Sequence, residues 1–151
     1  MSEMKDTMEP GSYWSLEFER SDILSQVDLP VIIEGVESLN PYDEKNGWMT
    51  LSKYSIERKL LGFTQTGASP EGYIVEAQLK DGVCPIDIGF WKAGRMERSG
   101  SIISQSGDGR FQTFANEAIQ PDEVKAIFRH FYLHFDLHPD FTWRSILEDF
   151  E

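Results

Sequence analysis

The spacing of the apolar residues changes once along the chain, and this change limits the folds that the chain can adopt. Before residue 115, short stretches alternate apolar with polar residues, as in YWSLEFE (Tyr13–Glu19) and GYIVEAQL (Gly72–Leu79). A period of two is typical of a strand with one buried face. From residue 121 onward the apolar residues instead recur at helical spacing, at Val124, Ile127, Phe128, Phe131 and Phe135.

These two patterns predict an α+β fold. Further strand-like stretches are WMTLSKYSI, PIDIGFW, SGSIISQ and GRFQTFA, and turn residues such as Asn46-Gly47 and Asp81-Gly82 separate them. VIIEGVESL also reads as a β segment, ERKLLGF fits either a strand or a helical turn, and SDILSQVDLP fits a short helix or a loop. We therefore expect an antiparallel β-meander or curved sheet of about 5–7 strands.

One amphipathic helix is expected to pack on this sheet near the C-terminus. Pro121 suits the first helical position, Gln120 and Glu123 form a capping-type pair, and Pro139 is expected to end the helix. TWRSILEDF then predicts a short terminal helix that begins near Asp140 or Thr142. Residues 1–11 read as a flexible N-terminal leader, and residues 12–151 as a single α+β domain.

The chain is strongly acidic, with 26 acidic residues against 14 basic ones and a formal net charge of −12. A field of this sign repels nucleic acids and anionic membranes, and it attracts a basic partner. Cys84 is the one cysteine, so no internal disulfide can form, and no stretch approaches the roughly 18 apolar residues of a membrane span. We expect a soluble, cytoplasmic protein that binds neither nucleic acid nor membrane.

The sequence contains no recognisable catalytic or cofactor-binding motif. The serines around Gly100 and Gly107 form no Gly-x-Ser-x-Gly elbow, and SQSGDGR reads as a hairpin tip rather than a phosphate-binding loop. Neighbouring acids such as Glu17 and Glu19 fit a solvated face better than an acid–base pair. We therefore expect a protein that is not an enzyme and has no cofactor.

All three histidines, His130, His134 and His138, lie in RHFYLHFDLHP, each four residues from the next. On a helix this spacing places them along one border of the apolar stripe. Two such histidines can bind zinc, but a closed site needs four ligands, and nothing resembles His-Glu-x-x-His. We favour a structural role and assign no metal site; contact with a partner and metal binding are the alternatives.

The segment IQPDEVKAIFRHFYLHFDLHPDFTWRSI (residues 119–146) resembles the closing segment of Imm-type immunity proteins from bacterial polymorphic-toxin and contact-dependent growth inhibition systems. The shared features are a final amphipathic helix, a short link with Pro139, and Trp143 beside Arg144. The resemblance implies a small cytosolic protein that binds a cognate toxin, often a nuclease or deaminase, and blocks its active site. It assigns no binding residue.

An acidic domain without catalytic motifs suits a blocker of a basic, nucleic-acid-directed toxin, because its carboxylates can take the places of phosphates. Tyr42 and Trp48 flank acidic residues, and aromatic anchors in charged rims are typical of protein-binding hot spots. Charge density alone selects the candidate partner-binding residues Asp43, Glu44, Glu34, Glu37, Glu148 and Asp149. The alternatives are a small β-rich enzyme or ligand-binding domain, and an adaptor subunit.

Overall fold

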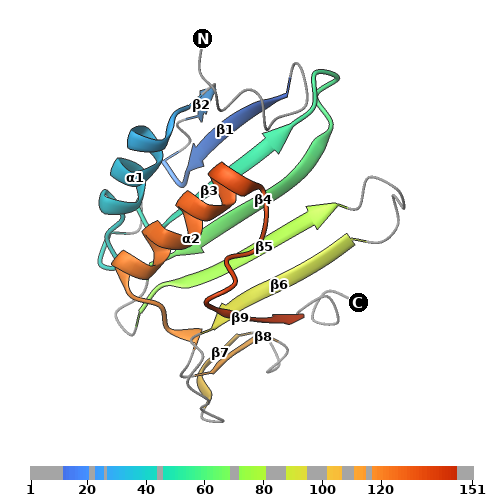
Figure 1. The fold of residues 1–151 in the computed structure, drawn as a ribbon. Helices are drawn as coiled ribbons and strands as arrows, with labels where there is room; N and C mark the ends of the chain where they lie inside the picture. The colour runs from blue at the N-terminus through green and yellow to red at the C-terminus, as the bar shows by residue number, and fades with distance from the viewer. Residues whose placement is uncertain are drawn as a thin grey trace.

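The structure, a computed structural model, shows the predicted α+β fold, with two helices on one face of an antiparallel sheet (Figure 1). It describes residues 12–20, 23–25, 27–43, 46–68, 72–80, 88–94, 102–106, 111–114 and 117–145, with the backbone alone at 80, 88–92, 102–106, 111–114 and 144–145. The leader expected at residues 1–11 lies outside these ranges. Neither described helix combines the length and the apolar character that crossing a bilayer requires.

The main sheet has seven strands in the order β2-β1-β3-β4-β5-β6-β9. Their bounds are β1 Tyr13–Phe18, β2 Ile23–Ser25, β3 Trp48–Tyr54, β4 Leu60–Gly67, β5 Ile74–Lys80, β6 Ile88–Gly94 and β9 Thr142–Ser145. All neighbours pair antiparallel, and β3 to β6 follow one another along the chain, so the predicted meander is confirmed. A second sheet pairs β7 (Ile102–Ser106) with β8 (Phe111–Phe114), as expected for the stretches on either side of SGDG.

Helix α1 spans Leu29–Glu37, so the prediction of a β segment over VIIEGVESL was wrong. Asp28 caps the helix by accepting a hydrogen bond from the Val31 N–H at 3.2 Å, and Pro30 lies in the first turn, where its missing N–H is not needed. The β-branched residues favour a strand locally, but packing of an amphipathic face outweighs that preference. The buried face consists of Ile32, Gly35 and Val36.

Two segments for which the sequence allows or predicts a helix contribute strands at the edges of the sheet. SDILSQVDLP, expected as a short helix or a loop, contributes β2 beside β1. The terminal helix expected from Asp140 or Thr142 is absent over Thr142–Ser145, where β9 pairs with β6. β2 forms backbone hydrogen bonds with β1, and β9 forms them with β6, each along an edge that would otherwise lack a neighbouring strand. These hydrogen bonds outweigh the weak helix propensity of both segments.

Helix α2 spans Pro121–His134 and confirms the predicted amphipathic helix with its capping box. Its end was predicted too late, because Phe135 already adopts a left-handed backbone conformation, with φ of 50°. The Phe135 ring lies over Gly62 of β4, where an added Cβ would stand 2.9 Å from the ring. The anchoring of Phe135 on the sheet therefore ends the helix before Pro139.

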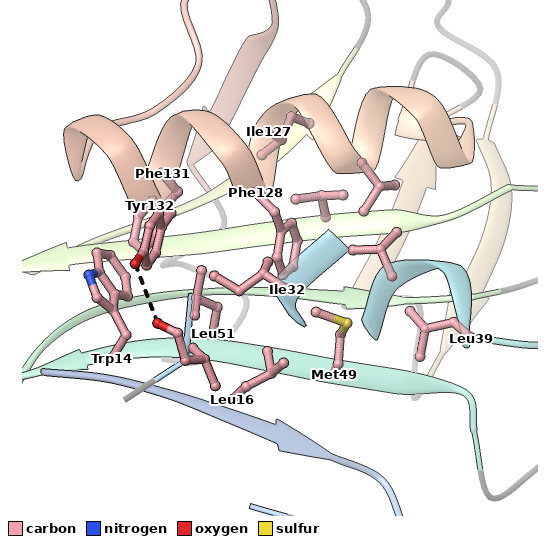
Figure 2. Packing of buried hydrophobic residues seen from close by; sticks show 14 of the residues in the cluster. Trp14, Leu16, Ile32, Leu39, Met49, Leu51, Ile127, Phe128, Phe131 and Tyr132 are labelled. Carbon is pink, nitrogen blue, oxygen red and sulfur yellow. Dashed lines mark hydrogen bonds between the residues drawn. The ribbon is translucent and has the colours of Figure 1, made fainter. Parts of the chain in front are cut away.

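The hydrophobic core lies between the sheet and both helices (Figure 2). Tyr132 crosses this layer, and its hydroxyl donates a hydrogen bond to the Val27 carbonyl at 3.3 Å. Lys53 is also buried on this face, with its ammonium 4.5 Å from the centre of the Phe135 ring. The core side chains labelled in Figure 2 are Trp14, Leu16, Ile32, Leu39, Met49, Leu51, Ile127, Phe128, Phe131 and Tyr132.

Candidate functional site

The sheet face opposite the helices holds a hollow of about 400 Å³, which we call the sheet hollow. This volume falls in the lower part of the range of roughly 300–1,000 Å³ that small-ligand sites occupy. The residues that line it come from β1, β3, β4 and β5 and are Glu17, Trp48, Thr50, Gln65, Thr66, Gly67, Ile74 and Glu76.

Gly67 creates the sheet hollow. The strand register places Trp48, Gly67 and Ile74 next to one another on β3, β4 and β5. Because Gly67 has no side chain, the middle of this row is open, and the nearest described atom to an added Cβ is the Gly47 carbonyl oxygen at 4.0 Å. Trp48 is 38% exposed, so part of this residue's surface is accessible to a ligand or partner. The hollow therefore has two apolar sides with a glycine between them.

A second row of residues gives the sheet hollow its charge. Glu17, Thr50, Gln65 and Glu76 are neighbours in register on β1, β3, β4 and β5. The Gln65 side-chain amide donates to Glu76 Oε1 at 2.8 Å, and the Thr50 hydroxyl donates to Gln65 Oε1 at 3.4 Å. With about 4.8 Å between strands, the Cα atoms of Glu17 and Glu76 lie roughly 14 Å apart. The two carboxylates come from opposite sides of the hollow, and no lining residue whose side chain the structure describes is basic. Lys92 of β6, described by its backbone alone, pairs with Glu76.

The loop residues 40–43 and 46–47 border the sheet hollow, because they lead into Trp48 and the Gly47 carbonyl oxygen lies 4.0 Å from an added Cβ at Gly67. The Gly47 N–H donates to Glu19 Oε1 at 2.8 Å, and the Gly47 carbonyl accepts from the Ala68 N–H at 2.7 Å. These bonds fix the loop to the ends of β1 and β4. Tyr42, at the outside of this loop, is 80% exposed. An exposed aromatic ring therefore lies on a loop that is held in place.

Several elements end beside this loop, and their acidic residues gather there. Lys125 of α2 forms an ion pair with Glu37 of α1 at 2.8 Å, and this hydrogen bond raises the pKa of Lys125. The Tyr73 hydroxyl donates to the Leu39 carbonyl at 3.4 Å, which joins the start of β5 to the end of α1. We call this region the acidic end. Its acidic residues with described side chains are Glu17, Glu19, Glu37, Asp43, Glu76, Asp122 and Glu123, and its basic residues with described side chains are Arg20 and Lys125. Lys92, described by its backbone alone, pairs with Glu76.

The structure describes three of the candidate partner-binding residues. Glu34 is exposed on α1, and Glu37, three residues later, forms the ion pair with Lys125. Asp43 is half-buried, and its Oδ2 accepts from the Asn46 side-chain amide at 2.7 Å. The structure thus places Glu37 at the end of α1 and Asp43 in the segment that follows it, with Glu34 about one turn before Glu37 along α1. The candidates outside the described residues are Glu44, Glu148 and Asp149.

Sequence reasoning missed most of the sheet hollow. It assigned Glu17 to a solvated face and did not select Gln65, Gly67, Ile74 or Glu76. One signal was available, because a lone glycine inside a strand pattern often marks a place that another group approaches closely. The register that sets Gly67 between Trp48 and Ile74 was needed to interpret that signal.

The three histidine rings cluster at the end of α2. The centre of the His130 ring lies 4.6 Å from that of His134 and 4.9 Å from that of His138. His138 lies beyond the helix, so the predicted helical row is wrong for this residue, and the chain folds back to complete the cluster. The Trp143 indole donates to the His138 carbonyl at 2.9 Å, which ties β9 to the cluster. In the part of the chain that the structure describes, no group of His, Cys, Asp or Glu side chains is arranged to hold a metal ion.

The cluster predicts a loss of stability in mild acid. Burial, followed by the charges of His138 and His134, lowers the pKa of His130 from 6.5, while Asp136 and Asp140 act in the opposite direction. The folded chain therefore binds a proton at His130 more weakly than the unfolded chain does. Neutral His130 contributes its full share of the folding stability above pH 6.5, and this share declines as the pH falls below 6.5.

We expect the substitution His130→Gln to flatten the fall of the unfolding free energy from about pH 7 to about pH 5. Urea unfolding across this range, with the exposed neighbour Arg129→Gln as control, measures the change. Equal slopes for the His130 variant and the unchanged protein would contradict the prediction.

Comparison of the chain with models of protein families, with curated proteins and with solved structures gave no match. The site is therefore interpreted from its own geometry.

Proposed function

We propose that the chain is a cytosolic immunity protein that binds a basic, nucleic-acid-directed toxin domain and neutralises it by covering its active site with acidic surface. The observation that carries the proposal is the acidic end, where the exposed side chains of Tyr42 and Trp48 lie among carboxylates. Aromatic anchors provide contact area, and the surrounding negative charge accelerates the encounter with a basic surface.

The experiment that tests this function starts with capture of the partner. The tagged protein is used to retain binding proteins from its native host, with washes at low and then high salt. Each retained protein is identified, expressed alone, and then expressed together with this chain. The proposal expects one basic protein that is toxic alone and harmless in the one-to-one complex. A retained protein that is harmless alone, or whose toxicity persists in the complex, contradicts the immunity function.

Removing negative charge from the acidic end and from the adjoining turn of α1 is expected to slow association by about tenfold at low salt. The variant combines Glu34→Gln, Glu37→Gln and Asp43→Asn, and the amide oxygen introduced by the last change can still accept from Asn46. Stopped-flow measurement of the association rate tests this, and the difference should shrink at about 1 M salt, where the Debye length is only about 3 Å.

A charge-matched control combines Glu57→Gln, Asp136→Asn and Asp140→Asn. These residues lie beyond the far ends of β3 and α2. At about 3.4 Å per residue, the seven residues of β3 place its far end, next to Glu57, about 20 Å from Trp48 at the acidic end. If both triple variants slow association equally, net charge rather than the acidic end directs the encounter.

The sheet hollow favours a second candidate, a small ligand-binding domain. Its volume of about 400 Å³, its accessible indole and its two carboxylates suit a small organic cation. In this case the chain needs no protein partner, and a cationic metabolite from the host would be retained instead.

A further inference from the structure

The sheet hollow is built around one missing side chain. The row Trp48, Gly67, Ile74 crosses three strands, and the central residue leaves an opening between an indole and an aliphatic side chain. Gly67 is not among the glycines with positive φ in the described residues, so its backbone does not require glycine. The glycine therefore matters here for the space that it leaves.

The described polar groups of the sheet hollow favour positive charge. Among the lining residues whose side chains the structure describes, the charged ones are Glu17 and Glu76, on β1 and β5. Glu76 is oriented by the hydrogen bond from Gln65, which is in turn oriented by Thr50. The indole of Trp48 offers a face on which a cation can rest. A ligand that contacts both carboxylates and the Trp48 indole is planar, positively charged and rich in N–H donors.

We propose that the sheet hollow receives the guanidinium group of an arginine side chain presented by the partner protein. This inference rests on the proposed function and names the site at which the basic partner is recognised. Guanidinium fits better than ammonium, because it stacks flat on an indole and donates up to five N–H bonds in fixed directions. A carboxylate on each side of the hollow gives those donors acceptors in more than one direction.

The test uses a probe that does not depend on the partner. Nα-acetylarginine amide is titrated into the full ¹⁵N-labelled chain, with the neutral isostere Nα-acetylcitrulline amide as the matched ligand. The arginine probe is expected to bind with millimolar affinity and to shift the indole N–H signal of Trp48 and the amide signal of Gly67. Equal shifts with both probes, or none with either, would overturn the proposal.

Two substitutions assign the binding to the sheet hollow. Gly67→Val fills the opening with a side chain that strands favour, and the nearest described atom to its Cβ is 4.0 Å away. Ser15→Val adds the same side chain to β1 outside the hollow. We expect Gly67→Val to weaken binding of the arginine probe at least tenfold, and Ser15→Val to leave it unchanged. Equal effects of the two variants would overturn the assignment.

The same variants separate this inference from the proposed function. With the captured partner, Gly67→Val should raise Kd at least tenfold, and replacement of one arginine of the partner by lysine should have a similar effect. If the partner is bound and neutralised but Gly67→Val has no effect, the proposed function stands and the arginine site falls. If the arginine probe binds the hollow but no protein partner is captured, the immunity function and the arginine site on a partner are both wrong, and the hollow is a site for a small cation.

Discussion

Replacement of Phe128 by alanine is expected to lower the free energy of unfolding by about 3–5 kcal/mol. Phe128 is fully buried, and its ring points from α2 into the core above the sheet (Figure 2). Removal of the ring leaves a cavity that rigid neighbours on the sheet and helices fill only in part. Urea unfolding followed by circular dichroism measures this loss, and Tm should fall by roughly 6–20 °C.

Ile56→Ala provides the control for this substitution. Ile56 lies in the turn between β3 and β4 and is 68% exposed, so its loss should change stability by no more than about 0.5 kcal/mol. A Phe128 variant that unfolds at the same urea concentration as the Ile56 variant would show that α2 does not pack on the sheet as described.

Gly62→Ala is expected to destabilise the protein by about 2–3 kcal/mol, although alanine normally stabilises where the backbone accepts it. An added Cβ would stand 2.8 Å from the Gln78 carbonyl oxygen and 2.9 Å from the Phe135 ring. Both contacts are closer than a Cβ atom tolerates, and the carbonyl belongs to the neighbouring strand. Either the end of α2 or the strand pair must therefore shift. Chemical unfolding of the variant measures the cost.

Gly67→Ala is the matched control, because it makes the same change in the same strand. At Gly67 the nearest described atom is 4.0 Å away, so the substitution should be neutral or stabilising by up to about 1 kcal/mol. A double-mutant cycle of Gly62→Ala with Phe135→Ala should show a coupling of about 1 kcal/mol or more. Equal losses at Gly62 and Gly67, or no coupling to Phe135, would contradict the proposed contact.

The sequence predicted those elements whose local pattern and tertiary environment agree. Helix α2 carries an amphipathic stripe and its own capping box, and β5 alternates so that Val75 and Ala77 face the core. Where the two disagree, the prediction was wrong. In α1 the residues Val31 and Ile32 favour a strand, yet the Asp28 cap and burial against the sheet make a helix. In β9 the decisive partner is β6, which lies far earlier in the chain.

The candidate site was less predictable than the fold. Charge density selected Asp43 and Glu37 as candidates, but it does not show that Glu37 forms an ion pair with Lys125. The sheet hollow depends on register, because a shift of one residue would turn Trp48 and Glu76 toward the opposite face. Register is fixed by contacts across the whole sheet, so the sequence of a single strand does not determine it.

The edges of the main sheet limit how another protein can engage this domain. Within the described residues, one edge strand, β2, has three residues, and the other, β9, has four. Such short edges offer too few free backbone groups for a partner to extend the sheet with a strand of its own. Under the proposed function, recognition then depends on side chains of the pleated face and its loops. Single substitutions on that face can change the preferred partner while the core and the hydrogen-bonded sheet stay as they are.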